Sequence, residues 1–142
     1  MSKAAPTPSA HAVLAKAGPF PPAAYVFVQD GLRFTVRRFQ EERAATAGLG
    51  GLDGSEHVTG QQLCLGLRDY AIDQYGMLAR AVLEQWNIRR TDDFGRMVFA
   101  MIEAGHMSKT PQDTLEDFRG VYEFDEAFAR EHVSQALRLA LA

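Results

Sequence analysis

Residues 57–105 constrain the fold more than any other part of the chain, because they predict three consecutive helices joined by short turns. Thr59 and Gln62 have the spacing of a capping box, in which each side chain bonds the backbone N–H of the other. Apolar residues recur at intervals of three and four in each helix, as on a buried helix face. Gly66 leaves room for a neighbouring helix, and Gly76 stands where a helix ends in a left-handed residue.

The segments on either side continue this helical pattern. Residues 11–17 predict a short helix, and residues 23–43 predict a long one with a single apolar face. A last helix is expected from Asp125 to the C-terminus. The large apolar residues of the long helix are Tyr25, Val28, Leu32, Val36 and Phe39.

Two segments are expected to lie outside the packed helices. Residues 1–10 are small, contain proline and carry little charge, so they predict a disordered tail. Residues 44–56 are rich in glycine and alanine and predict a flexible loop. The predicted fold class is therefore mainly α, a compact bundle of about five helices that forms a single domain over residues 11–142.

A short β-hairpin is predicted after the third of the three helices. Residues 120–124 alternate apolar and polar side chains, which is typical of a brief strand, and residues 107–109 are the expected partner strand. Helices followed by such a hairpin are the order of a winged helix, in which residues 92–104 would be the recognition helix.

The distribution of charge argues against a chain built to bind phosphates. The formal net charge is −3, and acidic residues are in excess after residue 50. A nucleic-acid-binding domain is usually basic overall or has one dense basic face. Arg33, Arg37 and Arg38 form the densest basic cluster, which is either a solvated face paired with Glu41 and Glu42 or a patch for a phosphate or an acidic partner.

Cys64 is the single cysteine, so an intramolecular disulfide is excluded and a reducing compartment is favoured. No apolar run approaches the roughly 18 residues that a membrane span needs. We therefore predict a cytoplasmic protein with no membrane partner.

No residue pattern predicts a reaction. The four histidines, His11, His57, His106 and His132, lack the spacing of zinc ligands. Cys64 lies beside an apolar stripe and is expected to be a buried, inert thiol. The sequence therefore predicts no catalytic, cofactor-binding or metal-binding residue.

Four stretches carry a resemblance to a known family. AAYVFVQDGLRFT, HVTGQQLCLGLRDYAIDQYG, LARAVLEQWNIRRTDDFGRMVFAMIEAGHMSKTPQD and EDFRGVYEFDEAF follow one another over residues 20–130. In order and spacing they resemble a small bacterial family of conserved hypothetical proteins from the planctomycete and verrucomicrobial lineages. The resemblance implies a single folded domain. It implies no activity, because none is assigned to that family.

These observations favour a small helical protein–protein interaction or adaptor domain with an acidic surface, acting on a protein partner or on a second copy of the chain. The residues expected on that surface are Arg89, Arg90, Asp92, Asp93, Asp113, Glu116, Asp117 and Glu123. The first alternative is a winged-helix-like nucleic-acid-binding protein with a role in transcription. Its expected contacts are Arg89, Arg90, Arg96, Lys109 and Arg119. A small enzyme whose site is not visible in the sequence is the second alternative.

Overall fold

The computed structural model describes residues 10–45, 58–107 and 114–141, and within these ranges the protein is mainly helical, as predicted. In chain order the elements are α1 (Ala10–Ala17), α2 (Pro22–Ala45), α3 (Gly60–Tyr75), the 3-10 turn η2 (Gly76–Leu78), α4 (Ala79–Gln85), α5 (Thr91–Glu103), the 3-10 turn η3 (Leu115–Phe118), α6 (Phe124–Ala127) and α7 (Arg130–Leu141).

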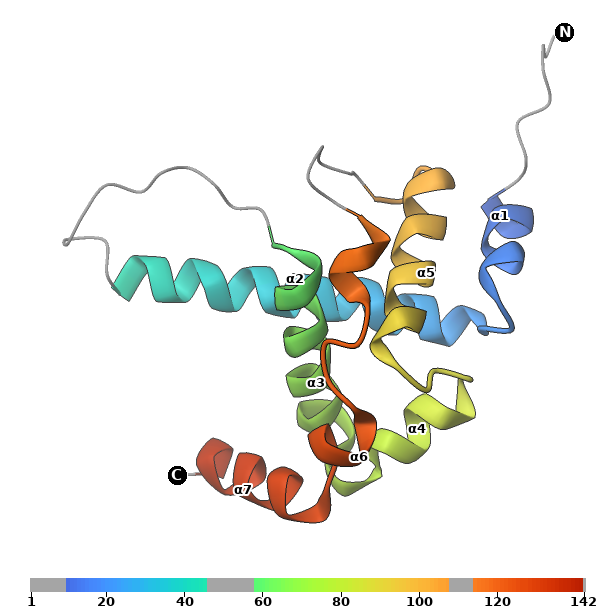
Figure 1. Ribbon diagram of the computed structural model, residues 1–142. Coiled ribbons are helices and arrows are strands. Elements are labelled where there is room, and N and C mark those ends of the chain that lie inside the picture. Colours follow the sequence, from blue (N-terminus) through green and yellow to red (C-terminus); the bar gives the residue numbers. More distant parts are fainter. Residues whose placement is uncertain (1–9, 46–57, 108–113, 142) are drawn as a thin grey trace, which may run out of the picture.

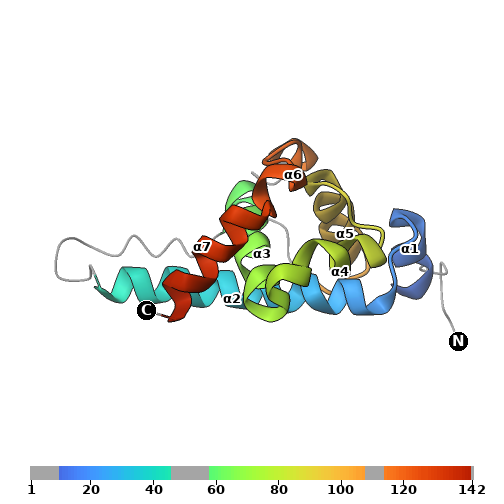
Figure 2. The same ribbon diagram turned by 90° about the horizontal axis from the view of Figure 1, so that it is seen from below.

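Helix α2 is the base of the assembly. Figure 1 shows α3 and α5 both crossing α2, with α1 at its N-terminal end. In Figure 2 the helices α3, α4 and α5 lie on one side of α2. The core between them is apolar and includes the fully buried side chains of Val28, Leu67, Leu83 and Phe94, one from each of these four helices.

The C-terminal end of α2 leaves this core. Residues 36–45 are all described, and none of them is buried. Figures 1 and 2 show this end, which we call the α2 arm, extending past α3. Helix α7 extends from the other end of α3 on the same side of the molecule (Figure 1). The α2 arm and α7 therefore lie on the same side of α3.

Close contact at the crossing of α2 and α3 sets the direction of the arm. A methyl group added to Gly66 would overlap the Thr35 hydroxyl and lie 2.8 Å from Thr35 Cβ. On the opposite helix, a methyl group on Gly31 would overlap the Leu67 side chain. The expectation that Gly66 leaves room for a neighbouring helix is confirmed, and that neighbour is α2.

The beginning of α3 is also as predicted. The Gln62 backbone N–H donates to Thr59 Oγ1 (3.1 Å), and the Thr59 N–H donates to Gln62 Oε1 (2.9 Å). This reciprocal pair satisfies two of the backbone donors that a helix start leaves without an internal partner.

The predicted β-hairpin is not found. No strand occurs in the described part of residues 106–124, and residues 108–113 lie outside that part. The Val121 N–H donates to Thr91 Oγ1 (3.0 Å) rather than to a neighbouring strand. Tyr122 turns inward, and its hydroxyl donates to the Cys64 carbonyl (2.8 Å). The alternation in residues 120–124 comes from an irregular segment packed on α3 and α5.

Two predicted helices differ in detail. The second of the three helices expected within residues 57–105 starts with the 3-10 turn η2 and becomes α4 at Ala79. The last predicted helix is divided into α6 and α7, which directs α7 onto α3 and η2. Most of the predicted tail 1–10 and of the predicted loop 44–56 lies outside the described residues. In the described ranges, no helix has both the length and the apolar character needed to span a membrane.

Candidate functional site

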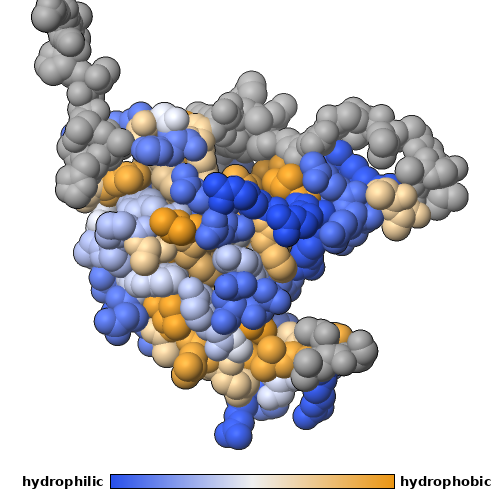
Figure 3. Space-filling model, turned by 180° about the vertical axis from the view of Figure 1, so that it is seen from behind, coloured by the Kyte–Doolittle hydropathy of each residue, from blue (hydrophilic) through white to orange (hydrophobic). Residues whose placement is uncertain are grey.

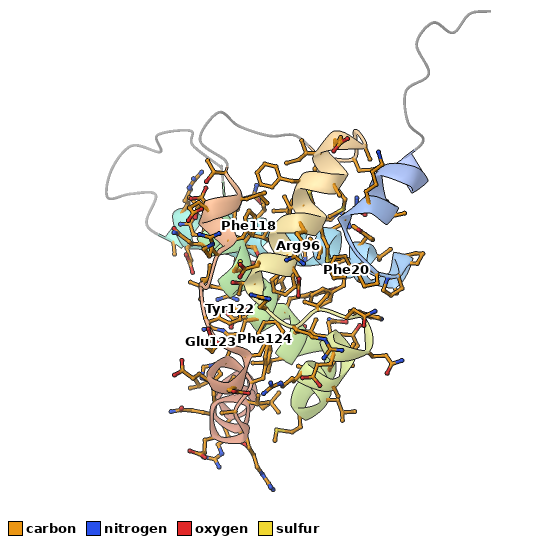
Figure 4. The ribbon with its side chains drawn as sticks, turned by 45° about the vertical axis from the view of Figure 1, so that its right-hand side comes forward. Phe20, Arg96, Phe118, Tyr122, Glu123 and Phe124 are labelled. Carbon is orange, nitrogen blue, oxygen red and sulfur yellow. The ribbon has the colours of Figure 1, made fainter. Side chains whose placement is uncertain are left out.

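Most of the described residues of the predicted interaction surface lie at the beginning of α5 and on η3, which packs on α5, and most of their carboxylates bind neighbouring groups. Figure 4 shows Arg96 on α5 with Phe118 and Phe20 on either side of it in that view, and Tyr122, Glu123 and Phe124 further along the chain from Phe118. The side chains of Arg89 and Arg90 are exposed.

Asp93 is buried, with an exposed fraction of 5%. Its Oδ2 accepts from the backbone N–H groups of Arg89 (2.8 Å) and Arg90 (3.2 Å). Its Oδ1 accepts from the Arg96 guanidinium (2.9 Å). A carboxylate with three donors at a helix start caps that helix. Asp93 therefore holds the turn before α5 in place.

The next acidic group binds the chain that follows η3. Asp92 Oδ1 accepts from the Gly120 N–H (3.2 Å). The buried hydroxyl of Thr91 donates to the Phe118 carbonyl (2.7 Å) and accepts from the Val121 N–H (3.0 Å). The Thr91 side chain therefore bridges α5 and residues 118–121.

The remaining described residues of the two predicted sets are exposed or bind a neighbouring group. Glu116 and Arg119 form an exposed ion pair (3.1 Å), and Asp117 accepts from the Thr114 N–H (3.2 Å). Glu123 is exposed. Asp113 and Lys109 lie outside the described residues. The four described arginines of the nucleic-acid alternative therefore share this surface with carboxylates, which reduces its attraction for phosphate.

We expect Thr91→Val to lower the free energy of unfolding by about 2 kcal/mol, because it leaves a buried carbonyl and an amide without their shared partner. Urea denaturation would measure the loss. Asp92→Asn retains an acceptor for Gly120 and should change stability by less than about 0.5 kcal/mol. Equal losses in the two variants would contradict a bridging role for Thr91.

The Cys64 thiol and the described side chains that could bind a metal show no catalytic arrangement. Burial, with a smaller contribution from the charge of Asp92, raises the pKa of the Cys64 thiol to about 12. At neutral pH the sulfur is therefore protonated and enclosed, whereas a nucleophilic cysteine needs an accessible thiolate. Among the described residues, no three His, Cys, Asp or Glu side chains are grouped so that they could hold a metal ion. His57 lies outside these residues.

A groove of about 690 Å³ between the α2 arm, α3 and α7 is open to a partner. Figure 3 shows the molecule hollowed between the hydrophilic end of α2 and the more hydrophobic surface of α7. The apolar side chains that line the groove are Phe34, Ile72, Ala136, Leu137 and Leu139, and the polar ones include Arg38, Arg68, Asp69, Asp73, His132 and Gln135.

One carboxylate between two guanidinium groups lies at the α2–α3 side of the groove. Asp69 Oδ2 accepts from Arg38 Nη1 on α2 (2.9 Å), and Asp69 Oδ1 accepts from Arg68 Nε on α3 (2.9 Å). The Arg38 guanidinium also lies over the Phe34 ring, 5.3 Å from its centroid. The same three charged residues line a second, smaller hollow of about 220 Å³ between α2 and α3.

The sequence analysis did not place a site here. Arg38 was recognised as part of a basic cluster, but its partner Asp69 is 31 residues away on another helix. Leu139 on α7 has an exposed fraction of 73%, the highest among the large hydrophobic side chains described. Exposed leucine on an otherwise amphipathic helix was the available signal.

Comparison with known proteins adds no assignment. No family model, no curated protein and no solved structure matches the chain. The resemblance to the bacterial family therefore stays a prediction.

Proposed function

We propose that this protein is a protein–protein interaction domain whose binding surface is the groove between the α2 arm, α3 and α7. The observation that carries the proposal is the groove itself, an apolar hollow with a charged margin whose two outer walls are helices. A groove of this kind accepts an amphipathic helix, which inserts apolar side chains from one face.

The two helices on either side of the groove support the same interpretation. The apolar side chains contributed by α7 include Leu139, which is largely exposed, so burying them in a complex would remove apolar surface from water. The α2 arm has no buried residue of its own. Because most of the stability of a helix in a protein comes from tertiary packing, this end of α2 gains stability when a partner packs on it.

Other functions have weaker support. A winged helix uses its hairpin as a wing, and the described residues contain no strand. Two of its expected phosphate contacts, Arg96 and Arg119, are in ion pairs with Asp93 and Glu116. The enzyme alternative would need a reactive group in a pocket, and Cys64 is buried with a raised pKa.

Site-specific photo-crosslinking tests the proposal. A photoreactive phenylalanine analogue is placed at Leu139 in the groove, and separately at Leu115, which is exposed on η3 beside the surface predicted from the sequence. In the protein's own cells we expect one discrete cross-linked product from position 139 and none from position 115. Ala136→Trp, which partly fills the groove, should reduce that product about tenfold or more.

The unfolding midpoint of each variant is the control for folding. Products of equal yield from both positions, or a product from position 139 that Ala136→Trp does not reduce, would contradict the groove as the binding surface. A product with twice the mass of the chain would identify a second copy as the partner.

A further inference from the structure

The charged side chains that line the groove indicate the chemistry of its partner. Arg38 and Arg68 come from different helices, and both line the groove as well as the smaller hollow beside it. Asp69 accepts a hydrogen bond from each of them. At this end of the groove one carboxylate therefore bonds both guanidinium groups, and the other carboxylate of the lining, Asp73, lies one helical turn further along α3.

Both guanidinium groups are held in position before any partner binds. Each of the two Asp69 oxygens accepts from a different arginine, and the Arg38 guanidinium carbon lies over the Phe34 ring, 5.3 Å from its centroid. A guanidinium has five N–H donors in a fixed plane, and only Nη1 of Arg38 and Nε of Arg68 take part in the two bonds to Asp69. Donors held in this way lose little conformational entropy when a carboxylate binds.

The charge of the lining side chains also changes along the groove. Its positive end is at Arg38 and Arg68, and one helical turn further along α3 the exposed carboxylate of Asp73 accepts from the Gln74 amide (3.1 Å). Apolar side chains from all three helices line the same groove. A partner that places a carboxylate at the arginine end and away from Asp73 therefore matches both the charge and the apolar surface.

We propose that the occupant of the groove is an amphipathic helix of a partner protein that carries an Asp or Glu side chain beside its apolar face, and that this carboxylate binds between Arg38 and Arg68. At the arginine end of the groove, each guanidinium group can then donate both to Asp69 and to the carboxylate of the partner. This inference rests on the proposed function, because it assigns the chemistry of a partner to the same groove. The walls formed by α2 and α7 favour a helix over a free small carboxylate, since a third helix can pack along both.

A displayed library of helical peptides is the probe. Peptides of about 16 residues, roughly four helical turns, are randomised on one face and selected against the immobilised full-length protein. In two parallel selections, the same library is selected for binding to the Leu139→Asp variant and for binding to the double variant Arg38→Gln/Arg68→Gln. We expect the first selection to enrich peptides with apolar residues at helical spacing and one acidic residue beside them, and both variants to lose these peptides.

Affinity measurements on synthetic peptides test the carboxylate directly. Replacing the selected Glu by Gln in a peptide should weaken its binding to the full-length protein about tenfold, as expected for the loss of a charge-assisted hydrogen bond. In the double arginine variant the two peptides should bind within about twofold of each other. Asp69→Asn removes the competing carboxylate, so it should strengthen binding of the Glu peptide about threefold. A purely structural role for Asp69 would instead weaken it.

The outcomes separate the two proposals. Peptides that depend on Leu139 but carry no acidic residue would overturn the acidic-partner inference and leave the groove as the binding surface. Peptides that bind Leu139→Asp unchanged, or a selection that enriches nothing, would overturn both. Preference of the full-length protein for a single-chain fatty carboxylate such as dodecanoate over every selected peptide would overturn the helical partner. A concentration-dependent dimer in sedimentation that Leu139→Asp dissociates would replace the partner protein with a second copy of the chain.

Discussion

Gly66→Ala should lower the free energy of unfolding by about 2–4 kcal/mol, although alanine is the better helix former by about 1 kcal/mol. The new methyl group would overlap the Thr35 hydroxyl and lie 2.8 Å from both Thr35 Cβ and Thr35 Cγ2. Cβ is attached directly to the backbone of α2, so a side-chain rotation cannot relieve this contact. The two helices must move apart, and the packing between them is lost.

A substitution of Thr35, the residue on α2 that contacts Gly66, tests this explanation. Thr35→Ala removes two of the three crowded atoms, so the double variant Gly66→Ala/Thr35→Ala should be more stable than Gly66→Ala alone. Gly105→Ala is the matched comparison. Gly105 has a φ of 85° and no atom within 4 Å of an added methyl group, so only backbone strain applies there, about 1 kcal/mol.

Urea denaturation measures each of these differences. The fluorescence of the single tryptophan reports the transition, because the Trp86 ring packs on Phe27 and Tyr75 with ring centroids 5.5 and 6.1 Å apart. A Gly66→Ala variant as stable as the original protein would show that α2 and α3 do not meet at this contact. The direction of the α2 arm, and with it the groove, would then need another explanation.

Local chemistry made part of the fold predictable. The capping box at Thr59 and Gln62 depends on residues three apart, and the structure has both of its hydrogen bonds. Gly76 was recognised because a helix end with a positive φ favours glycine, and its φ is 55°, although its ψ of −129° lies outside the left-handed helical region. These signals depend only on neighbouring residues, so a single sequence is sufficient to find them.

The groove could not be predicted in the same way, because it depends on which helices meet. Arg38 and Asp69 are both ordinary charged residues in amphipathic helices until α2 crosses α3. The acidic residues at the start of α5 were singled out because they are close in sequence, yet the carboxylates of Asp92 and Asp93 bind backbone groups of their own fold. Likewise, alternation in residues 120–124 predicted a strand because burial by two helices produces the same pattern as a sheet face.

The pH dependence of stability tests the packing around Cys64, where α3 meets the segment before α6. The thiol has an ordinary pKa of 9.0, and burial together with the charge of Asp92 raises it to about 12 in the folded protein. Between these pH values the unfolded chain has lost the thiol proton and the folded chain still holds it. Folding then requires uptake of a proton, so the free energy of unfolding falls as pH rises.

The expected size of this effect is large. One such group lowers the free energy of unfolding by about 1.4 kcal/mol for each pH unit, so its contribution, fully present below pH 9, is reduced by about 3 kcal/mol at about pH 11. Urea denaturation of the original protein and of Cys64→Ala over this range measures the effect. The difference in stability between the two should be constant below pH 9 and should shift by that amount above it.

Tyr122→Phe is the control, because it removes a second buried group with a different ordinary pKa. Burial, followed by the charge of Cys64, raises the pKa of Tyr122 well above its ordinary value of 10.0. Its effect has the same sign as that of Cys64 but should begin about one pH unit higher, and its loss also removes the hydrogen bond to the Cys64 carbonyl. If the stability difference between the original protein and Cys64→Ala stays constant from about pH 7 to about pH 11, the thiol is not buried beneath Tyr122 in the folded protein.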